Sequence, residues 1–180
     1  MTKSLLALLF AACTTPALAA LAPGAVAPEF SAPAFLAGKP FTFDLAQALK
    51  KGPVVLYFFP AAHTSGCNLE AHLFAEAVDD FKAEGATLIG VTAGNIDQLA
   101  AFSAETEHCS GKFAVAADPD KAIAARYDST LLMHPRWSGR TSYVITPEDK
   151  VIFAYDALNP TQHVALTLDA LKKWRAGHPR

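Results

Sequence analysis

One stretch decides the fold of this chain: Val54-Val55-Leu56-Tyr57-Phe58-Phe59-Pro60, then Ala61-Ala62-His63-Thr64-Ser65-Gly66-Cys67 and Asn68-Leu69-Glu70. Its six consecutive apolar residues, β-branched and aromatic, predict a strand that is buried on both faces of a sheet. Pro60 ends this strand because proline has no N–H to give to the ladder. From Cys67 to Phe81, apolar residues recur at three- and four-residue spacing, which predicts one helix.

The sequence places Cys67 at the carboxyl end of a buried strand and in the first turn of a helix. Unpaired N–H groups and the positive end of the helix dipole favour an anion at such a position. Because the thiolate is the reactive form of cysteine, this placement predicts a site for thiol chemistry.

The rest of the chain alternates strands and helices. We expect extended, mostly irregular chain over 20–40, strands over 40–44, 86–92, 113–117, 140–146 and 151–156, and an irregular loop over 128–139. We expect helices from Asp44 to Lys50, from Asn95 or Asp97 past Phe102, from Asp118-Pro119 to Tyr127, and over 160–176. Strands 140–146 and 151–156 are close enough to form an antiparallel hairpin. The order predicts one α/β domain over 20–180, a sandwich with a mixed central sheet flanked by helices.

Composition limits the class of protein. The 180 residues are enough for one domain with a sizeable core. A formal net charge of −2 and a pI near 6.3 provide no basic surface for nucleic acid, so we expect no nucleic-acid partner.

Residues 1–19 have the features of an export signal. Lys3 supplies a positive start, residues 4–12 form a short apolar run, and Ala17-Leu18-Ala19 is a small-x-small cleavage site. We expect cleavage after Ala19 and release into the periplasm if the source is a Gram-negative bacterium, with no stable membrane insertion. Two alternatives stay open: an uncleaved cytosolic tail, and lipoprotein processing at Cys13, since Phe10-Ala11-Ala12-Cys13 resembles a lipobox.

The pattern Pro60-x-x-x-Thr64-x-x-Cys67 with Glu70 resembles the active-site motif of the peroxiredoxins, the AhpC/TSA-type peroxidases. The resemblance continues through the 86–91 strand, Asp118-Pro119-Asp120, Arg140-x-Ser142-Tyr143-Val144-Ile145 and Asn159-Pro160, and it covers most of 24–175. Within that family the chain is similar to the bacterioferritin-comigratory-protein branch. The resemblance implies a thioredoxin-like three-layer fold and thiol-dependent reduction of hydrogen peroxide and organic hydroperoxides, in antioxidant defence.

The resemblance also implies a role for each motif residue. Cys67 would be the nucleophile, and Thr64 would direct its hydroxyl to the peroxide and the thiolate. Arg140 would support the thiolate and the transition state, Pro60 would shield the site, and Glu70 would orient the arginine. It implies no metal or organic cofactor. The implied partners are a peroxide and a thioredoxin-like or small-thiol reductant, and we expect a monomer or weak dimer.

Simpler interpretations exist for several of these residues. Thr64 could only cap the helix, Pro60 could only end the strand, and Glu70 could only complement the helix dipole. Their occurrence together with Arg140 favours the site. His63 could tune the thiolate or be a solvated loop residue. The other histidines lack zinc spacing, and we interpret them as surface or packing residues: His72, His108, His134, His163 and His178.

Cys109 is a candidate resolving cysteine. Many members of this branch carry that cysteine five positions after the nucleophile, where this chain has His72, and others carry it in the region that holds Ser103 here. Cys109 lies further on, just past the end of the predicted helix. A resolving role from a shifted position and no role in turnover both stay open; export to an oxidising compartment favours the first.

Two rival functions share the predicted fold. An exported thiol–disulfide oxidoreductase needs a second cysteine separated from the first by two residues, and this chain has Glu70 at that position. A non-enzymatic thioredoxin-fold module would have no use for Thr64, Cys67 and Arg140 together. Peroxide consumption with and without Cys67 separates the three hypotheses.

Overall fold

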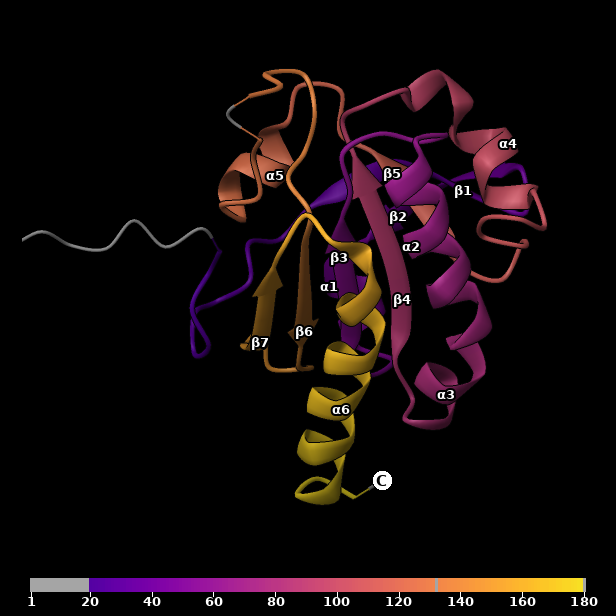
Figure 1. Ribbon diagram of the computed structural model, residues 1–180. Coiled ribbons are helices and arrows are strands. Elements are labelled where there is room, and N and C mark those ends of the chain that lie inside the picture. Colours follow the sequence, from indigo (N-terminus) through magenta and orange to yellow (C-terminus); the bar gives the residue numbers. More distant parts are fainter. Residues whose placement is uncertain (1–19, 132, 180) are drawn as a thin grey trace, which may run out of the picture.

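Strand β3 (Val54–Phe58) contributes to two hydrophobic cores at once. Val54, Leu56 and Phe58 pack into the core on one face of the sheet, whereas Val55 and Tyr57 pack into the core on the other. Successive side chains of a strand point to opposite faces, so an uninterrupted apolar run is buried on both sides. In this computed structural model, which describes residues 20–131 and 133–179, β3 lies within the central sheet (Figure 1).

The described residues form a seven-stranded mixed sheet in the order β2-β1-β5-β4-β3-β6-β7. Strands β3, β4 and β5 are parallel, and the other neighbours are antiparallel. The mixed sheet and the β6–β7 hairpin confirm the predicted fold class. The remaining strands are β1 (Ser31–Leu36), β2 (Lys39–Asp44), β4 (Thr87–Thr92), β5 (Ala114–Ala117), β6 (Thr141–Ile145) and β7 (Val151–Asp156).

Helices cover both faces of the sheet and complete three layers. The helices are α1 (Leu45–Leu49), α2 (Ser65–Glu76), α3 (Val78–Ala83), α4 (Leu99–Ala104), α5 (Ala122–Arg126) and α6 (His163–Ala176), with short 3₁₀ helices η1 (Ile96–Gln98) and η2 (Pro160–Gln162). Helices α1 and α5 pack on the face of Leu56. Helices α2, α3, α4 and α6 pack on the face of Tyr57, and Figure 1 shows α2, α3 and α6 in front of the sheet.

Two of the predicted helix caps are present and one is not. The Asp44 carboxylate accepts the backbone N–H of Gln47 at 2.8 Å, as the sequence predicts. Asp118 accepts the backbone N–H groups of Ile123 and Ala124, although α5 begins only at Ala122. Neither Asn95 nor Asp97 caps α4, whose N-cap is Gln98: Asp97 lies within η1, and the Asn95 amide donates to the Ala62 carbonyl at 2.8 Å and so braces the loop before Cys67.

The expectation of an irregular chain over 20–40 is wrong for its second half. Residues 31–36 form β1, which pairs with both β2 and β5. The turn between β1 and β2 has positive φ at Ala37 and Gly38, the geometry that suits the twist of a two-residue hairpin. Pro33 is tolerated because the pairing with β5 involves Ala34 and Phe35 instead.

The predicted helix from Cys67 to Phe81 is divided at Ala77, where α2 ends and α3 begins. Neither proline nor glycine marks this position. Val78 and Phe81 are buried after the break, and the ring of Phe81 lies 5.9 Å from that of Phe74. Tertiary packing of the same apolar face therefore redirects the helix.

The predicted export signal and Cys13 lie outside the described residues. Within 20–131 and 133–179, no helix combines the length and the apolar character that crossing a membrane requires. The described parts of the loop, 128–131 and 133–139, are irregular as predicted and contain one isolated bridge, between Thr130 and Ser138.

Candidate active site

The Cys67 side chain is buried in the first turn of α2, on the face of the sheet to which Tyr57 points. The strand–proline–loop–helix sequence places it there: β3 ends at Phe58, and Thr64 occupies the N-cap with extended backbone angles. Cys67 is a free thiol. A free, buried sulfur at a helix start is the arrangement that the sequence predicted.

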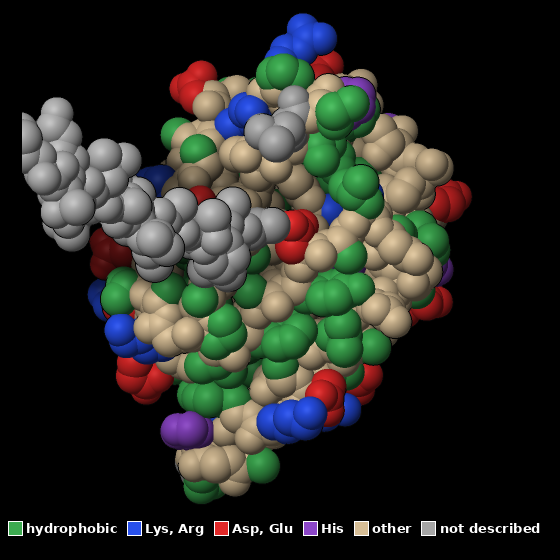
Figure 2. Space-filling view, turned by 60° about the vertical axis from the view of Figure 1, so that its left-hand side comes forward, with side chains coloured by type: hydrophobic (Ala, Val, Ile, Leu, Met, Phe, Trp, Pro, Cys, Tyr) green, Lys and Arg blue, Asp and Glu red, His purple; other side chains and the backbone are tan. Residues whose placement is uncertain are grey.

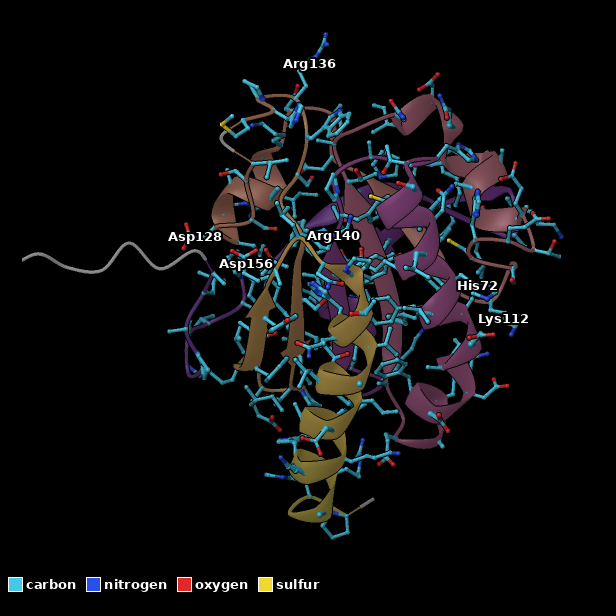
Figure 3. The ribbon with its side chains drawn as sticks, in the orientation of Figure 1. His72, Lys112, Asp128, Arg136, Arg140 and Asp156 are labelled. Carbon is cyan, nitrogen blue, oxygen red and sulfur yellow. The ribbon has the colours of Figure 1, made fainter. Side chains whose placement is uncertain are left out.

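Arg140 contacts this sulfur from its position directly before β6, the strand that pairs with β3. Its Nη2 lies 3.4 Å from Cys67 Sγ, and the guanidinium is almost completely buried. Strand β6 pairs antiparallel with β3, Thr141 opposite Phe58, so the residue entering β6 lies at the end of β3 where the Cys67 loop begins. Figure 3 shows Arg140 near the centre of the molecule, whereas Arg136 extends from the outer tip of the same loop.

Glu70 holds the guanidinium in place. Its Oε2 accepts a hydrogen bond from Arg140 Nη1, and both side chains are buried. Burial raises the pKa of Glu70 to about 8, although the adjacent guanidinium opposes this shift. The structure therefore brings together three of the predicted site residues, Cys67, Glu70 and Arg140.

Gly66 leaves room for the guanidinium. Its carbonyl accepts from Arg140 Nη1 at 3.4 Å. A Cβ added at Gly66 would lie 3.1 Å from Arg140 Nη2, closer than ordinary contacts allow. The sequence offered no signal for this function, because the need for glycine arises from a residue on a distant strand.

His163, at the start of α6, is a buried neighbour of the site that the sequence did not identify. Its Nδ1 lies 2.7 Å from Ser142 Oγ and 3.6 Å from Glu70 Oε1, and its Nε2 lies 2.8 Å from the Ala157 carbonyl. Burial lowers the pKa of His163 to about 4, so the ring is neutral, donates from Nε2 and accepts the Ser142 hydroxyl at Nδ1. It packs behind Glu70.

Thr64 and Pro60 lie in the loop that joins β3 to α2 and leads to Cys67. The Thr64 hydroxyl donates to the Ala61 carbonyl at 3.0 Å and makes no side-chain cap bond, so simple helix capping is the wrong interpretation. Its predicted role at a bound peroxide stays a prediction. Pro60 is buried, and its carbonyl accepts the Thr92 hydroxyl at 3.0 Å.

Cys109 lies five residues beyond the end of α4, as expected, and its thiol is free and completely buried. Burial raises the pKa of the Cys109 thiol. It belongs to the same hydrophobic cluster as Cys67. The structure places both thiols on one face of the sheet, and the resolving role stays a prediction.

His63 is engaged in a way that neither interpretation of the sequence described. Its Nδ1 lies 2.7 Å from Gln98 Oε1 and its Nε2 lies 2.9 Å from Glu105 Oε2. Both ring nitrogens therefore contact the region around α4 and not the Cys67 sulfur.

The surface adds little to the definition of the site. On the face in Figure 2, acidic and basic side chains are intermixed, with hydrophobic side chains between them. An apolar hollow lined by Phe41, Phe81 and Phe113 contains none of the predicted site residues.

Together these features define a class: a thioredoxin-fold protein with a buried cysteine at a helix start and an arginine against its sulfur. The AhpC/TSA family matches residues 23–154, and the chain belongs to this family. The relatives that it resembles are named as peroxiredoxins and as the peroxidoxin BcpB, in agreement with the predicted resemblance.

Similar sequences include a chloroplastic peroxiredoxin Q of Triticum aestivum, 28% identical over 124 residues, 68% of this chain and 56% of the wheat protein. A putative peroxiredoxin of Mycobacterium tuberculosis is 28% identical over 118 residues, 62% of this chain and 73% of its own length. The chain thus spans little more than half the length of the wheat relative.

Similar structures include the peroxidoxin BcpB of Mycobacterium tuberculosis, with a TM-score of 0.73 and 26% identity over 84% of this chain and 96% of that one. The reduced 2-Cys peroxiredoxin of Plasmodium vivax has a TM-score of 0.76 at 21% identity, over 87% of this chain and 84% of that one. The second likeness shows the fold alone.

Proposed function

We propose that this protein is a thiol-dependent peroxidase that reduces hydrogen peroxide and organic hydroperoxides through Cys67. One observation carries the proposal: a buried guanidinium, held by Glu70, lies 3.4 Å from the Cys67 sulfur at a helix start. A fixed positive charge favours the thiolate and stabilises negative charge that develops next to it. Membership of the AhpC/TSA family supports this chemistry.

The first step is attack of the Cys67 thiolate on the terminal oxygen of the peroxide. An S–O bond forms as the O–O bond breaks, and the departing alkoxide or hydroxide takes up a proton. Cys67 becomes a sulfenic acid, oxidised by two electrons, and the peroxide is reduced to an alcohol or water. Arg140 stabilises the charge on the separating oxygens, and Pro60 and the buried setting limit the access of water.

The second step returns Cys67 to the thiol. A second thiol attacks the sulfenic sulfur, forms a disulfide and releases water. That thiol is either Cys109 or an external one, and a thioredoxin-like protein or a small thiol then supplies the two electrons. We also propose that the protein works as a monomer or weak dimer; the contacts that join Cys67, Glu70 and Arg140 are complete within one chain and need no second copy.

The rival thiol–disulfide exchange function lacks its second group. Glu70 occupies the position where that chemistry needs a resolving cysteine, and it is bonded to Arg140. A carboxylate cannot form a disulfide, so Cys67 has no partner within α2. The geometry therefore favours peroxide reduction.

The decisive experiment is peroxide consumption by the purified protein with dithiothreitol as the reductant. The Cys67→Ser variant should lose activity while keeping its circular dichroism spectrum. The Cys109→Ser variant should keep the first turnover, because attack of Cys67 on the peroxide does not require a second thiol. If Cys67→Ser retains most of its activity, the proposal is wrong.

We further propose that the protein is exported and matures near Ala20. The features that support export are Lys3, the apolar run over 4–12, and Ala17-Leu18-Ala19. Intact-mass measurement on natively produced protein tests this: a mass that begins at Ala20 is expected, whereas a diacylglyceryl addition at Cys13 would identify a lipoprotein.

A further inference from the structure

Three potential metal ligands meet at the loop that precedes Cys67, one from this loop and two from the segment that follows α4. They are His63, Glu105 and His108, and their ligand atoms all lie within 4.8 Å of one another. His63 Nε2 lies 2.9 Å from Glu105 Oε2, and His108 Nε2 lies 3.3 Å from the same oxygen. The nitrogens of two rings thus converge on one carboxylate oxygen.

We propose that His63, Glu105 and His108 form a binding site for a divalent transition-metal ion, with Zn²⁺ the ion that suits it. Two imidazole nitrogens and one carboxylate oxygen are a ligand set that zinc accepts, with water in the fourth position. In tetrahedral zinc with bonds of about 2.0–2.1 Å, neighbouring ligand atoms lie roughly 3.4 Å apart. The separations of 2.9 and 3.3 Å are close to that spacing, so small side-chain movements are enough.

The second ring nitrogen of His63 supports the assignment. Its Nδ1 lies 2.7 Å from Gln98 Oε1 and donates to this carbonyl oxygen. With Nδ1 engaged by Gln98, Nε2 is the nitrogen left for a metal; without an ion it donates to Glu105 Oε2, and a bound ion would take the place of that proton. Outer partners of this kind orient the imidazole ligands of protein metal sites.

Packing holds the two rings near their required positions. Phe102 lies 5.3 Å from the His63 ring and 4.9 Å from the His108 ring, and the two imidazoles lie 5.2 Å apart. The side chains of His63, Glu105 and His108 are 27%, 42% and 11% exposed. The cluster is therefore reachable by an ion from solvent yet partly enclosed by an aromatic wall.

The site would join the two segments that carry the thiols. His63 lies in the loop before Cys67, and Glu105 and His108 lie just before Cys109. A bound ion would hold these segments together and slow the local opening that exposes Cys109. If Cys67 is oxidised as proposed above, the ion would also slow formation of a Cys67–Cys109 disulfide. Only this last effect rests on the proposed peroxidase function.

Calorimetric titration with Zn²⁺ tests the site in the untagged full chain with Cys13, Cys67 and Cys109 all changed to serine. One ion should bind per chain, and Co²⁺ should give visible d–d bands without sulfur charge-transfer bands. His63→Ala, His108→Gln and Glu105→Gln should each weaken binding at least tenfold. Gln98→Ala should weaken it about tenfold through the outer partner.

The matched control is His72→Ala. His72 pairs with Glu76 at 3.4 Å on the exposed face of α2, so this pair offers two potential ligands but belongs to no group of three within the described residues. Zinc affinity should be unchanged in this variant. Two results would overturn the site and leave only an ion-pair cluster: no zinc binding to the parent protein, or zinc affinity in the folded His63→Ala and Glu105→Gln variants equal to that of the parent.

The effect of the ion on the local opening that exposes Cys109 can be measured without peroxide. In the Cys13→Ser/Cys67→Ser protein, Zn²⁺ should slow alkylation of the buried Cys109 several-fold, and His63→Ala should remove this protection. An unchanged alkylation rate at saturating Zn²⁺ would show that the ion does not hold the two segments together. Because only Cys109 reacts in this assay, failure of the peroxidase proposal would not affect its result.

Discussion

Arg140 Nη2 and Cys67 Sγ lie 3.4 Å apart although the two residues are separated by 73 positions in the sequence. The contact exists because β6 runs antiparallel to β3, with Thr141 opposite Phe58, so the chain enters β6 where the Cys67 loop leaves β3. Glu70 then fixes the guanidinium from within α2. The charge beside the sulfur is thus positioned by a strand on one side and a helix on the other.

Arg140→Met should slow the reaction of Cys67 with peroxide by about 10²–10³, the usual cost of removing one donor from a charge-stabilising site. Stopped-flow measurement of the first turnover checks this effect. The exposed residue Arg136, at the tip of the same loop in Figure 3, provides the control Arg136→Met. Equal rates in the two variants would remove Arg140 from the site.

Gly66→Ala should reduce peroxide reactivity at least tenfold with little loss of stability. The new Cβ would meet Arg140 Nη2 at 3.1 Å, and Glu70 and Cys67 limit how far the guanidinium can move. Gly177→Ala is the matched control, since the nearest atom to its Cβ would be at an ordinary 3.6 Å. Unchanged kinetics in Gly66→Ala would show that the guanidinium position is not critical.

The stability of the protein should fall as pH decreases from about 6.5 to about 4 because of His163. Burial lowers its pKa to about 4, so the unfolded chain binds a proton in this range that the folded protein does not. Stability from this group is present above pH 6.5 and lost toward pH 4, and the full effect is roughly 3 kcal/mol. Urea unfolding of His163→Gln should show a flatter slope in this range than the parent protein. An identical slope would contradict the assignment of His163 as a neutral buried ring.

Cys109, if it resolves, should do so only after local opening. Both thiols are buried and free, Cys67 is held in the first turn of α2, and a disulfide requires Cβ atoms about 3.5–4.5 Å apart. Sulfenic acid should therefore appear first and the cross-link later. One equivalent of peroxide, followed by timed alkylation, digestion and mass spectrometry, should reveal a Cys67–Cys109 peptide that accumulates slowly. Persistent sulfenic or sulfinic Cys67 with alkylatable Cys109 would instead identify a one-cysteine enzyme.

The local part of the site follows from the sequence alone. The apolar run that ends at Pro60, the short loop and the helical periodicity after Cys67 place this thiol at a helix start without information from the rest of the chain. The strand–helix alternation predicts a mixed sheet between helices for the same reason. Arg140 was predicted as a site residue only from the family resemblance, since no local pattern connects it with Cys67.

Only the tertiary structure decided which distant side chains meet. The sequence identifies His163 only as a surface or packing residue, and α6 places it beside Glu70. His63 lies in a different segment from Glu105 and His108, so no local spacing indicates that the three meet. Strand β1 depends on β5 as a partner, and the break at Ala77 depends on packing against the core. Periodicity and capping are properties of neighbouring residues, whereas these features depend on which surfaces the folded chain brings into contact.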